Sequence, residues 1–200
     1  MPAVNLPLCA ACKTRQCVGS KDCFDDVERH RALYEDPRIA RLHRAATAIE
    51  GRHYCKEPRI REIMLLAREL GLRRLGLAFC VGLADEAAIV DEIFSREFEV
   101  VSVCCKACGI AKRSLGLEQI RPERAHETSC NPAGQALLLN GANTELNVIC
   151  GLCVGHDAIF SMISRAPVTT LIVKDRVLAH NPAGAIYSPY IRRTLQSEAM

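Results

Sequence analysis

The sequence predicts an α/β protein, a three-layer and mostly parallel sheet with helices on both faces, preceded by a cysteine-rich segment and a helical region. From residue 73 onward, short apolar runs alternate with helical patterns, as in doubly wound sheets. Residues 25–72 show helical periodicity, and residues 1–24 hold four cysteines but too few large apolar side chains for a core. We therefore expect a cysteine-rich metal-binding segment at 1–24, a helical region packed on the main domain at 25–72, and a Rossmann-like domain at 73–200.

The helical region has recognisable start and stop signals. Asp25 and Asp26 suit a helix start, and Pro37 and Pro58 each suit the first turn of a new helix. In the last of these helices, apolar residues recur at helical spacing up to the stop at Gly71: Ile60, Ile63, Met64, Ala67 and Leu70.

The main domain begins with an apolar run at 75–80, followed by a helix that opens at Asp85 and Glu86. One face of that helix carries Leu83, Ala87, Val90 and Phe94. The next strand is expected at 99–104. Two strands joined by such a helix form a parallel pair with a right-handed crossover.

The second half of the domain continues the alternation. We expect a helix from Asn131 through Leu139, a strand at 146–149, a helix at 158–164 and a strand at 168–173, with a turn at 174–175 that leads into 177–179. The sequence Asn-Pro-Ala-Gly occurs at 131–134 and again at 181–184. These are either two independent helix starts or two places where a ligand-capable side chain precedes a helix N-terminus.

Composition excludes several classes of protein. The chain has 200 residues, 12 cysteines and a formal net charge of +3. A domain of this length buries enough surface to fold without disulfides. No secretory signal and no membrane-length apolar run is visible, so we expect a cytoplasmic protein with reduced thiols and no membrane association. The charge skew is too mild to indicate nucleic-acid binding.

The first 24 residues concentrate four thiols: Cys9, Cys12, Cys17 and Cys23. Four such ligands in a flexible segment can surround a tetrahedral ion or hold the irons of a cluster. The spacing matches neither bacterial ferredoxins nor common zinc ribbons. Because the thiols are close in sequence and no histidine joins them, the pattern favours an iron–sulfur cluster, [4Fe–4S] in particular, with zinc as the alternative cofactor.

A second group of cysteines follows the expected strands. Cys80, Cys104 and Cys150 end the first three strands, and the carboxyl edge of an open α/β sheet is where ligands bind. The predicted metal ligands at this edge are Cys104, Cys108, Cys150 and Cys153, and the further candidates for ligation or site lining are Cys80, Cys105, Cys130, His156 and His180. Cys104 and Cys105 point to opposite faces if both lie in a strand, so only one should enter the crevice.

Two further local features concern cysteines: the motif formed by Cys150 and Cys153, and the isolated Cys55. Cys150 and Cys153 form a Cys-x-x-Cys between a strand and a helix, which resembles the thioredoxin motif, although the order of elements differs. Cys55 is expected to be a packed thiol rather than a ligand. No Walker loop, dinucleotide fingerprint or nucleophile elbow is present, which argues against the usual nucleotide enzymes and serine hydrolases.

The residues also resemble a family of unknown function, number 1847. The similarity rests on Ser129 to Pro132, on Cys150 to Asp157, on 166–176 and 180–182, and on the N-terminal cysteines. Members are described only as candidate metal-binding proteins. The resemblance implies metal binding at the positions that match here: Cys9, Cys12, Cys17, Cys23, Cys150 and Cys153.

The sequence thus predicts a cysteine-ligated metal protein with a second cysteine site at the sheet edge that performs redox or small-substrate chemistry. Its partner would be an electron-transfer protein or a small molecule. A zinc-stabilised binding module without catalysis is the alternative, and a thiol oxidoreductase using Cys150 and Cys153 is the third. No catalytic residue is assigned, and whether the protein is an enzyme is left open.

Overall fold

The chain divides into two compact units, Met1–Gly51 and Arg52–Met200. The computed structural model describes residues 7–197. The division falls near the end of a helix inside the region expected to be helical. Among the described residues, no helix combines the length and apolar character needed to cross a membrane.

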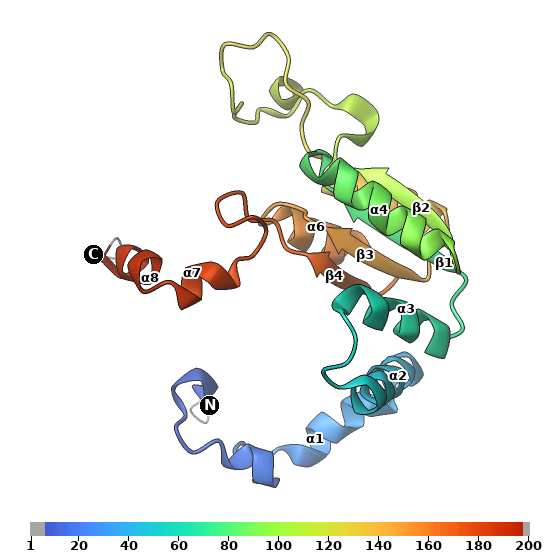
Figure 1. The fold of residues 1–200 in the computed structure, drawn as a ribbon, viewed down its shortest axis with the longest axis vertical. Helices are drawn as coiled ribbons and strands as arrows, with labels where there is room; N and C mark the ends of the chain where they lie inside the picture. The colour runs from blue at the N-terminus through green and yellow to red at the C-terminus, as the bar shows by residue number, and fades with distance from the viewer. Residues whose placement is uncertain (1–6, 198–200) are drawn as a thin grey trace. The chain divides into compact units, whose positions relative to one another are not determined.

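The first unit is built from short helical elements and from most of one longer helix, α2 (Figure 1). These are η1 (Cys9–Ala11), η2 (Gln16–Gly19), α1 (Val27–Ala32), η3 (Leu33–Glu35) and α2 (Pro37–His53). The prediction that Pro37 starts a helix is confirmed. The Asp36 carboxylate accepts hydrogen bonds from the backbone N–H groups of Arg38 and Ile39, at 2.8 and 3.3 Å, and so caps α2.

The second unit contains one sheet of four parallel strands, which confirms the predicted fold class. The strands are β1 (Arg74–Phe79), β2 (Glu99–Cys104), β3 (Leu146–Cys150) and β4 (Val168–Ile172), in the order β2-β1-β3-β4. From β1 the chain passes to β2 on one side, and it then crosses back over β1 to β3 on the other side. This reversal places a topological switch point between the carboxyl ends of β1 and β3.

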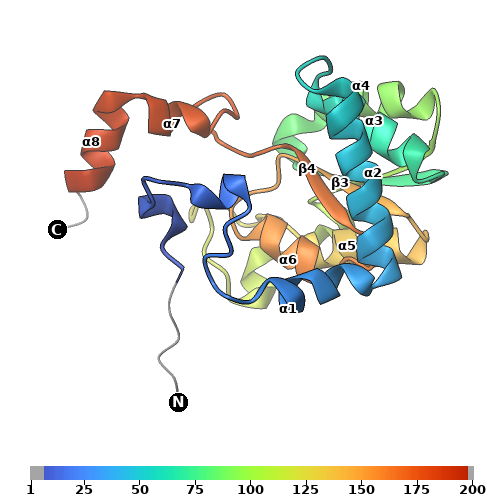
Figure 2. The same ribbon diagram turned by 90° about the horizontal axis from the view of Figure 1, so that it is seen from below.

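Helices cover both faces of this sheet. The covering helices are α3 (Arg59–Glu69), α4 (Ala84–Ser95), α5 (Pro132–Gly141) and α6 (His156–Ile163). With right-handed crossovers, the reversal puts α4 on one face and α5 and α6 on the other, and Figure 2 shows the strands between these layers. The remaining elements are η4 (Val81–Leu83), η5 (Ala107–Gly109), η6 (Lys112–Leu115), α7 (Ala183–Tyr187) and α8 (Pro189–Ser197).

The core lies between these layers and is closely packed. Strand β3 is buried along its whole length. At Gly76 in β1, an added Cβ would lie 2.0 Å from Asn147 Oδ1, so only glycine fits. The buried Asn147 side chain is satisfied by Thr144, which donates to it at 2.7 Å, and by Ser164, to which it donates at 2.8 Å.

Two local expectations were wrong. Residues 176–180 form a turn, so no strand continues after Lys174 and Asp175. Cys55 is exposed in the connection between α2 and α3, with a left-handed backbone (φ 57°), because that connection turns sharply and leaves the thiol in solvent. The buried faces predicted for α3 and α4 are confirmed.

Candidate functional site

Four thiols line a single cavity in the first unit. The cavity has a volume of about 760 Å³, and its wall includes Cys9, Cys12, Cys17 and Cys23. All four are free and exposed. The cavity is formed entirely by residues between Leu8 and His30. The four cysteines therefore line one space, although among the described residues no three of them stand close enough together to hold one metal ion.

The cavity wall supplies hydrogen bonds to sulfur. The backbone N–H of Arg15 donates to Cys12 Sγ at 3.4 Å, and this bond, with the side-chain hydrogen bond to Thr14, lowers the pKa of the Cys12 thiol. Arg15 and Ser20 both adopt left-handed backbone conformations, with φ of 46° and 70°. Such conformations in residues other than glycine are uncommon and often accompany functional constraints.

Asp22 fixes the last turn of this segment. Its carboxylate accepts backbone N–H groups from Phe24, Asp26 and Val27 at 3.0, 2.9 and 3.0 Å. These bonds hold its pKa below the usual range, with the bond from Phe24 contributing most. The turn that carries Cys23 is thus anchored by polar contacts, since no side chain from Cys9 to Phe24 is buried.

The second candidate site lies where β1 and β2 end. Backbone bonds align three segments there: Cys80 N–H to Cys150 O at 3.2 Å, Cys105 N–H to Phe79 O at 2.8 Å, and Asn131 N–H to Cys105 O at 2.8 Å. The thiols of Cys80, Cys105 and Cys130 meet at this point. We call these three residues the sheet-edge thiol cluster. Cys105, rather than Cys104, is therefore the residue that joins it.

Cys105 is the shared member of the cluster. Its side chain hydrogen-bonds to both Cys130 and Cys80, and these bonds with burial raise its pKa well above the ordinary range. The same hydrogen bonds are the largest cause that lowers the pKa of Cys80 and of Cys130, each to about 5. The favoured arrangement is a protonated Cys105 thiol between two thiolates, with its single proton donated to one of them at a time. Val81 N–H also donates to Cys105 Sγ, at 3.3 Å.

A lysine accompanies each outer thiol. Lys106 Nζ lies 3.4 Å from Cys130 Sγ and donates to Thr128 O at 2.7 Å, which fixes its position. Lys174 bonds to Cys80 on the other side and helps to lower the pKa of that thiol. A Cβ at Gly82 would lie 3.2 Å from Lys174 Nζ, a tight contact, and 4.0 Å from Cys80 Sγ, an ordinary one.

The other predicted ligands do not join this cluster. Cys104 pairs in register with Phe79, so its side chain faces the α4 side of the sheet. Cys108 is exposed, and Cys150 is fully buried, with burial raising its pKa to about 11. Within residues 7–197, no three His, Cys, Asp or Glu side chains stand close enough together to hold one metal ion.

Three more predicted site residues, Cys153, His156 and His180, lie at or near the ends of α6 and β4 and contact different groups. Cys153 Sγ accepts a hydrogen bond from Arg176 at 2.9 Å. His156, the first residue of α6, is near enough to Cys130 to help lower the pKa of that thiol. His180 Nδ1 accepts the backbone N–H of Asp175 at 3.1 Å.

The two Asn-Pro steps also differ, because Asn131 caps α5 with its side chain whereas α7 has no such cap.

Lys106, Lys174 and Gln135 are site residues that the sequence reasoning missed. The buried Gln135 side chain donates to Phe79 O and Val103 O, at 3.1 and 2.7 Å, and so ties the ends of β1 and β2 together. Its Oε1 has no hydrogen-bond partner in the described part of the chain. The available signal was proximity: Lys106 follows Cys105 directly, and Lys174 follows the expected end of β4.

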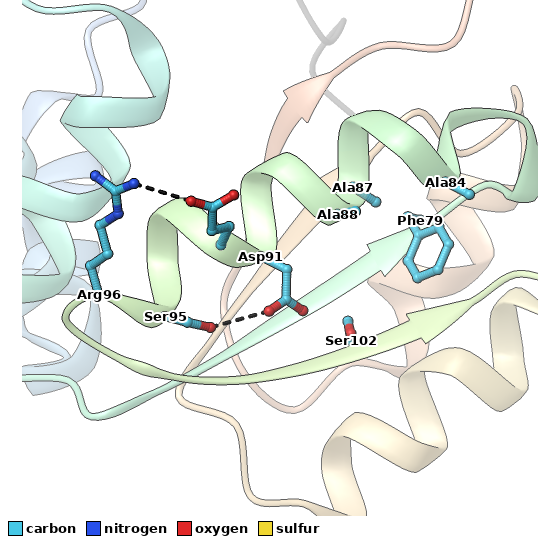
Figure 3. Close-up of a pocket in the computed structure, with 9 residues that line it drawn as sticks. Phe79, Ala84, Ala87, Ala88, Asp91, Ser95, Arg96 and Ser102 are labelled. Carbon is cyan, nitrogen blue, oxygen red and sulfur yellow. Dashed lines mark hydrogen bonds and ion pairs between the residues drawn. The ribbon is translucent and has the colours of Figure 1, made fainter.

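A further hollow of about 620 Å³ lies on the opposite face of the sheet (Figure 3). It is lined by α4 and by Phe79 and Ser102. Four of its polar side chains are paired with each other, Ser95 with Asp91 and Arg96 with Glu92, each at 3.1 Å. No cysteine or histidine reaches it.

The fold and its two cysteine sites define a cysteine-rich α/β protein. The model of the family described as "Protein of unknown function (DUF1847)" matches residues 18–171, and the chain belongs to this family. An uncharacterized protein of Methanocaldococcus jannaschii is 43% identical over 188 residues, covering 94% of this chain and 97% of that protein. No solved structure matches the chain.

Proposed function

We propose that this protein holds a metal centre at Cys9, Cys12, Cys17 and Cys23, an iron–sulfur cluster of the [4Fe–4S] type in the first instance, and that the centre serves electron transfer. The observation that carries the proposal is the shared cavity: all four thiols line one space of about 760 Å³. They belong to a segment without buried apolar side chains, and such a segment needs a ligand to gain a stable order.

The donor chemistry supports a cluster over a single ion. Thiolate is the ligand that both iron–sulfur clusters and structural zinc prefer, and no histidine or carboxylate is needed. A tetrahedral zinc site places its four sulfurs within about 2.3 Å of one ion. In the described part of the chain no three of these thiols stand close enough together to hold one ion. A cluster instead distributes its four thiolates over separate irons.

The surroundings of Cys12 support a redox role. Its sulfur accepts a backbone hydrogen bond from Arg15, and hydrogen bonds to cluster sulfurs are among the factors that set reduction potential. The group itself would supply one-electron chemistry when bound. The chain would supply the four ligands, the N–H donors to sulfur and the turn anchored at Asp22.

Anaerobic purification followed by iron, acid-labile sulfide and zinc analysis tests this proposal. We expect iron and sulfide in equal amounts, together with visible absorption. Cys12→Ser should lose both, whereas Cys55→Ser, which removes an exposed thiol outside the cavity, should keep both. Stoichiometric zinc without a chromophore would replace the cluster with the structural zinc alternative, and absence of any bound metal would overturn the proposal.

The thiol oxidoreductase alternative, with Cys150 and Cys153 as the exchanging thiols, receives less support. In a thioredoxin-type site the attacking thiol has a lowered pKa and solvent access. Cys150 has neither, because it is fully buried and its pKa is raised to about 11. Helix α6 also begins at His156, beyond both cysteines of the motif.

A further inference from the structure

We propose that the sheet-edge thiol cluster of Cys130, Cys105 and Cys80 is a thiol–disulfide exchange site that reduces small disulfides, with Cys130 as the attacking thiol and Cys105 as the resolving thiol. This inference concerns the second unit alone. It does not depend on the metal centre proposed for the first unit.

Geometry assigns the attacking role to Cys130. It is the only member of the cluster that is partly exposed, whereas Cys105 and Cys80 are 2% and 6% exposed. Lys106 Nζ lies 3.4 Å from its sulfur and is held there by Thr128 O. A cation in contact with an accessible thiol stabilises the thiolate, which is the form that attacks disulfides.

Cys105 is placed to resolve the first intermediate. Its buried side chain hydrogen-bonds directly to Cys130, so it can reach the same sulfur without solvent access. The backbone bond from Asn131 to Cys105 O, at 2.8 Å, fixes the two cysteine-bearing segments against each other. Val81 N–H, 3.3 Å from Cys105 Sγ, would stabilise a thiolate at that position.

Cys80 completes the cluster as the proton acceptor. It hydrogen-bonds to Cys105 and is itself accompanied by Lys174. When Cys130 has been consumed in a mixed disulfide, the proton of Cys105 can pass to the Cys80 thiolate. Cys105 then becomes the resolving thiolate without help from solvent.

The exchange balances as two successive displacements. The Cys130 thiolate attacks one sulfur of an external disulfide, its S–S bond breaks, and the departing thiolate takes a proton from water. The Cys105 thiolate then attacks Cys130 Sγ, the mixed-disulfide bond breaks as the Cys105–Cys130 disulfide forms, and the second external sulfur leaves as a thiolate that takes a proton from water. Two electrons pass from the cluster to the substrate, and an external dithiol returns them. Cys130 is itself only partly exposed, which favours small disulfides over the disulfides of folded proteins.

Disulfide mapping tests the proposal with glutathione disulfide as the probe. The reduced full-length protein is mixed anaerobically with the probe, quenched in acid, alkylated and analysed by mass spectrometry. We expect a Cys105–Cys130 linkage in the unaltered protein, and this arm requires no variant. In Cys105→Ser, a mixed disulfide with glutathione should accumulate at Cys130. Cys55→Ser should behave as the unaltered protein does.

Two further arms examine the roles and the substrate class. Cys80→Ser should still form the mixed disulfide but resolve it about 100-fold more slowly, the scale of a lost proton acceptor. Insulin, a protein disulfide, should not be reduced. The proposal is overturned if glutathione never reaches Cys130, if no linkage forms within the cluster, if insulin reacts as fast as glutathione disulfide, or if the purified protein holds a metal that Cys130→Ser removes.

Discussion

The two cysteine-rich regions of this chain place the same side chain in opposite surroundings. The thiols of the N-terminal segment are all exposed, and they line a cavity in a segment without a core. The sheet-edge thiols are wholly or partly buried at the end of a packed sheet. The difference shows what orders each site: strand packing positions the second, whereas backbone turns position the first, and the proposed metal centre would add to them.

Metal removal should produce the largest difference between the two regions. Structural metal sites contribute about 10–16 kcal/mol of apparent binding free energy in small peptides, and that energy is folding energy. Chelation under reducing conditions should abolish amide protection in residues 9–23 and leave β1 to β4 unchanged. Hydrogen exchange with mass spectrometry measures both regions in one sample. Equal loss in both, or none in either, would contradict the distinction.

Gly76→Ala should damage the second unit alone. The new Cβ would lie 2.0 Å from Asn147 Oδ1, within a fully buried part of the sheet. We expect the free energy of unfolding to fall by about 1–3 kcal/mol, as overpacked cores do. Denaturant titration measures the loss. Gly51→Ala is the matched control, because that helical position has open space around it and alanine is the better helix former.

Lys106→Gln should shift the titration of Cys130. The pKa of that thiol is lowered to about 5, first by Cys105, then by Lys106, with a contribution from His156. Loss of the lysine charge should raise it by roughly 1 unit. Alkylation of Cys130 followed against pH should therefore fall away at a higher pH in the variant, because the thiolate protonates earlier as the pH drops. An unchanged midpoint, or an equal shift in Lys56→Gln, would contradict the contact.

Glu97→Gln should have the smallest effect. Glu97 pairs with Arg68 and with Arg61, the latter at 3.5 Å, but all three side chains retain partial exposure. Ion pairs of this kind contribute about 0.2–1 kcal/mol. Thermal unfolding should show a correspondingly small decrease. A loss of unfolding free energy as large as that of Gly76→Ala would show that this ion pair stabilises the protein as much as core packing does.

The sequence allowed the alternation of helices and strands to be predicted because hydrophobic periodicity is local. The buried face of α4 and the helix start at Pro37 both rest on side chains within one or two turns. The strand order required nonlocal pairing and could not be derived. The sheet-edge cysteines illustrate the limit, since a shift of one residue decides whether Cys104 or Cys105 faces the cluster.

The candidate sites were partly predictable for the same reason. The four N-terminal cysteines lie within fifteen residues of one another, so the cavity that they share is a local property. Cys130 joins the second cluster through a backbone bond between Asn131 and Cys105, which no spacing rule indicates. The lysines beside Cys130 and Cys80 were missed because their role depends on that long-range contact.

Metal content in two paired variants tests the central distinction most directly. One carries Cys12→Ser and Cys17→Ser in the N-terminal cavity, and the other carries Cys80→Ser and Cys130→Ser in the sheet-edge thiol cluster. Both are purified anaerobically beside the unaltered protein, and bound metal per chain is measured. We expect the first pair to lose the metal and the second to retain it in full. Retention in the first pair, or loss in the second, would contradict it.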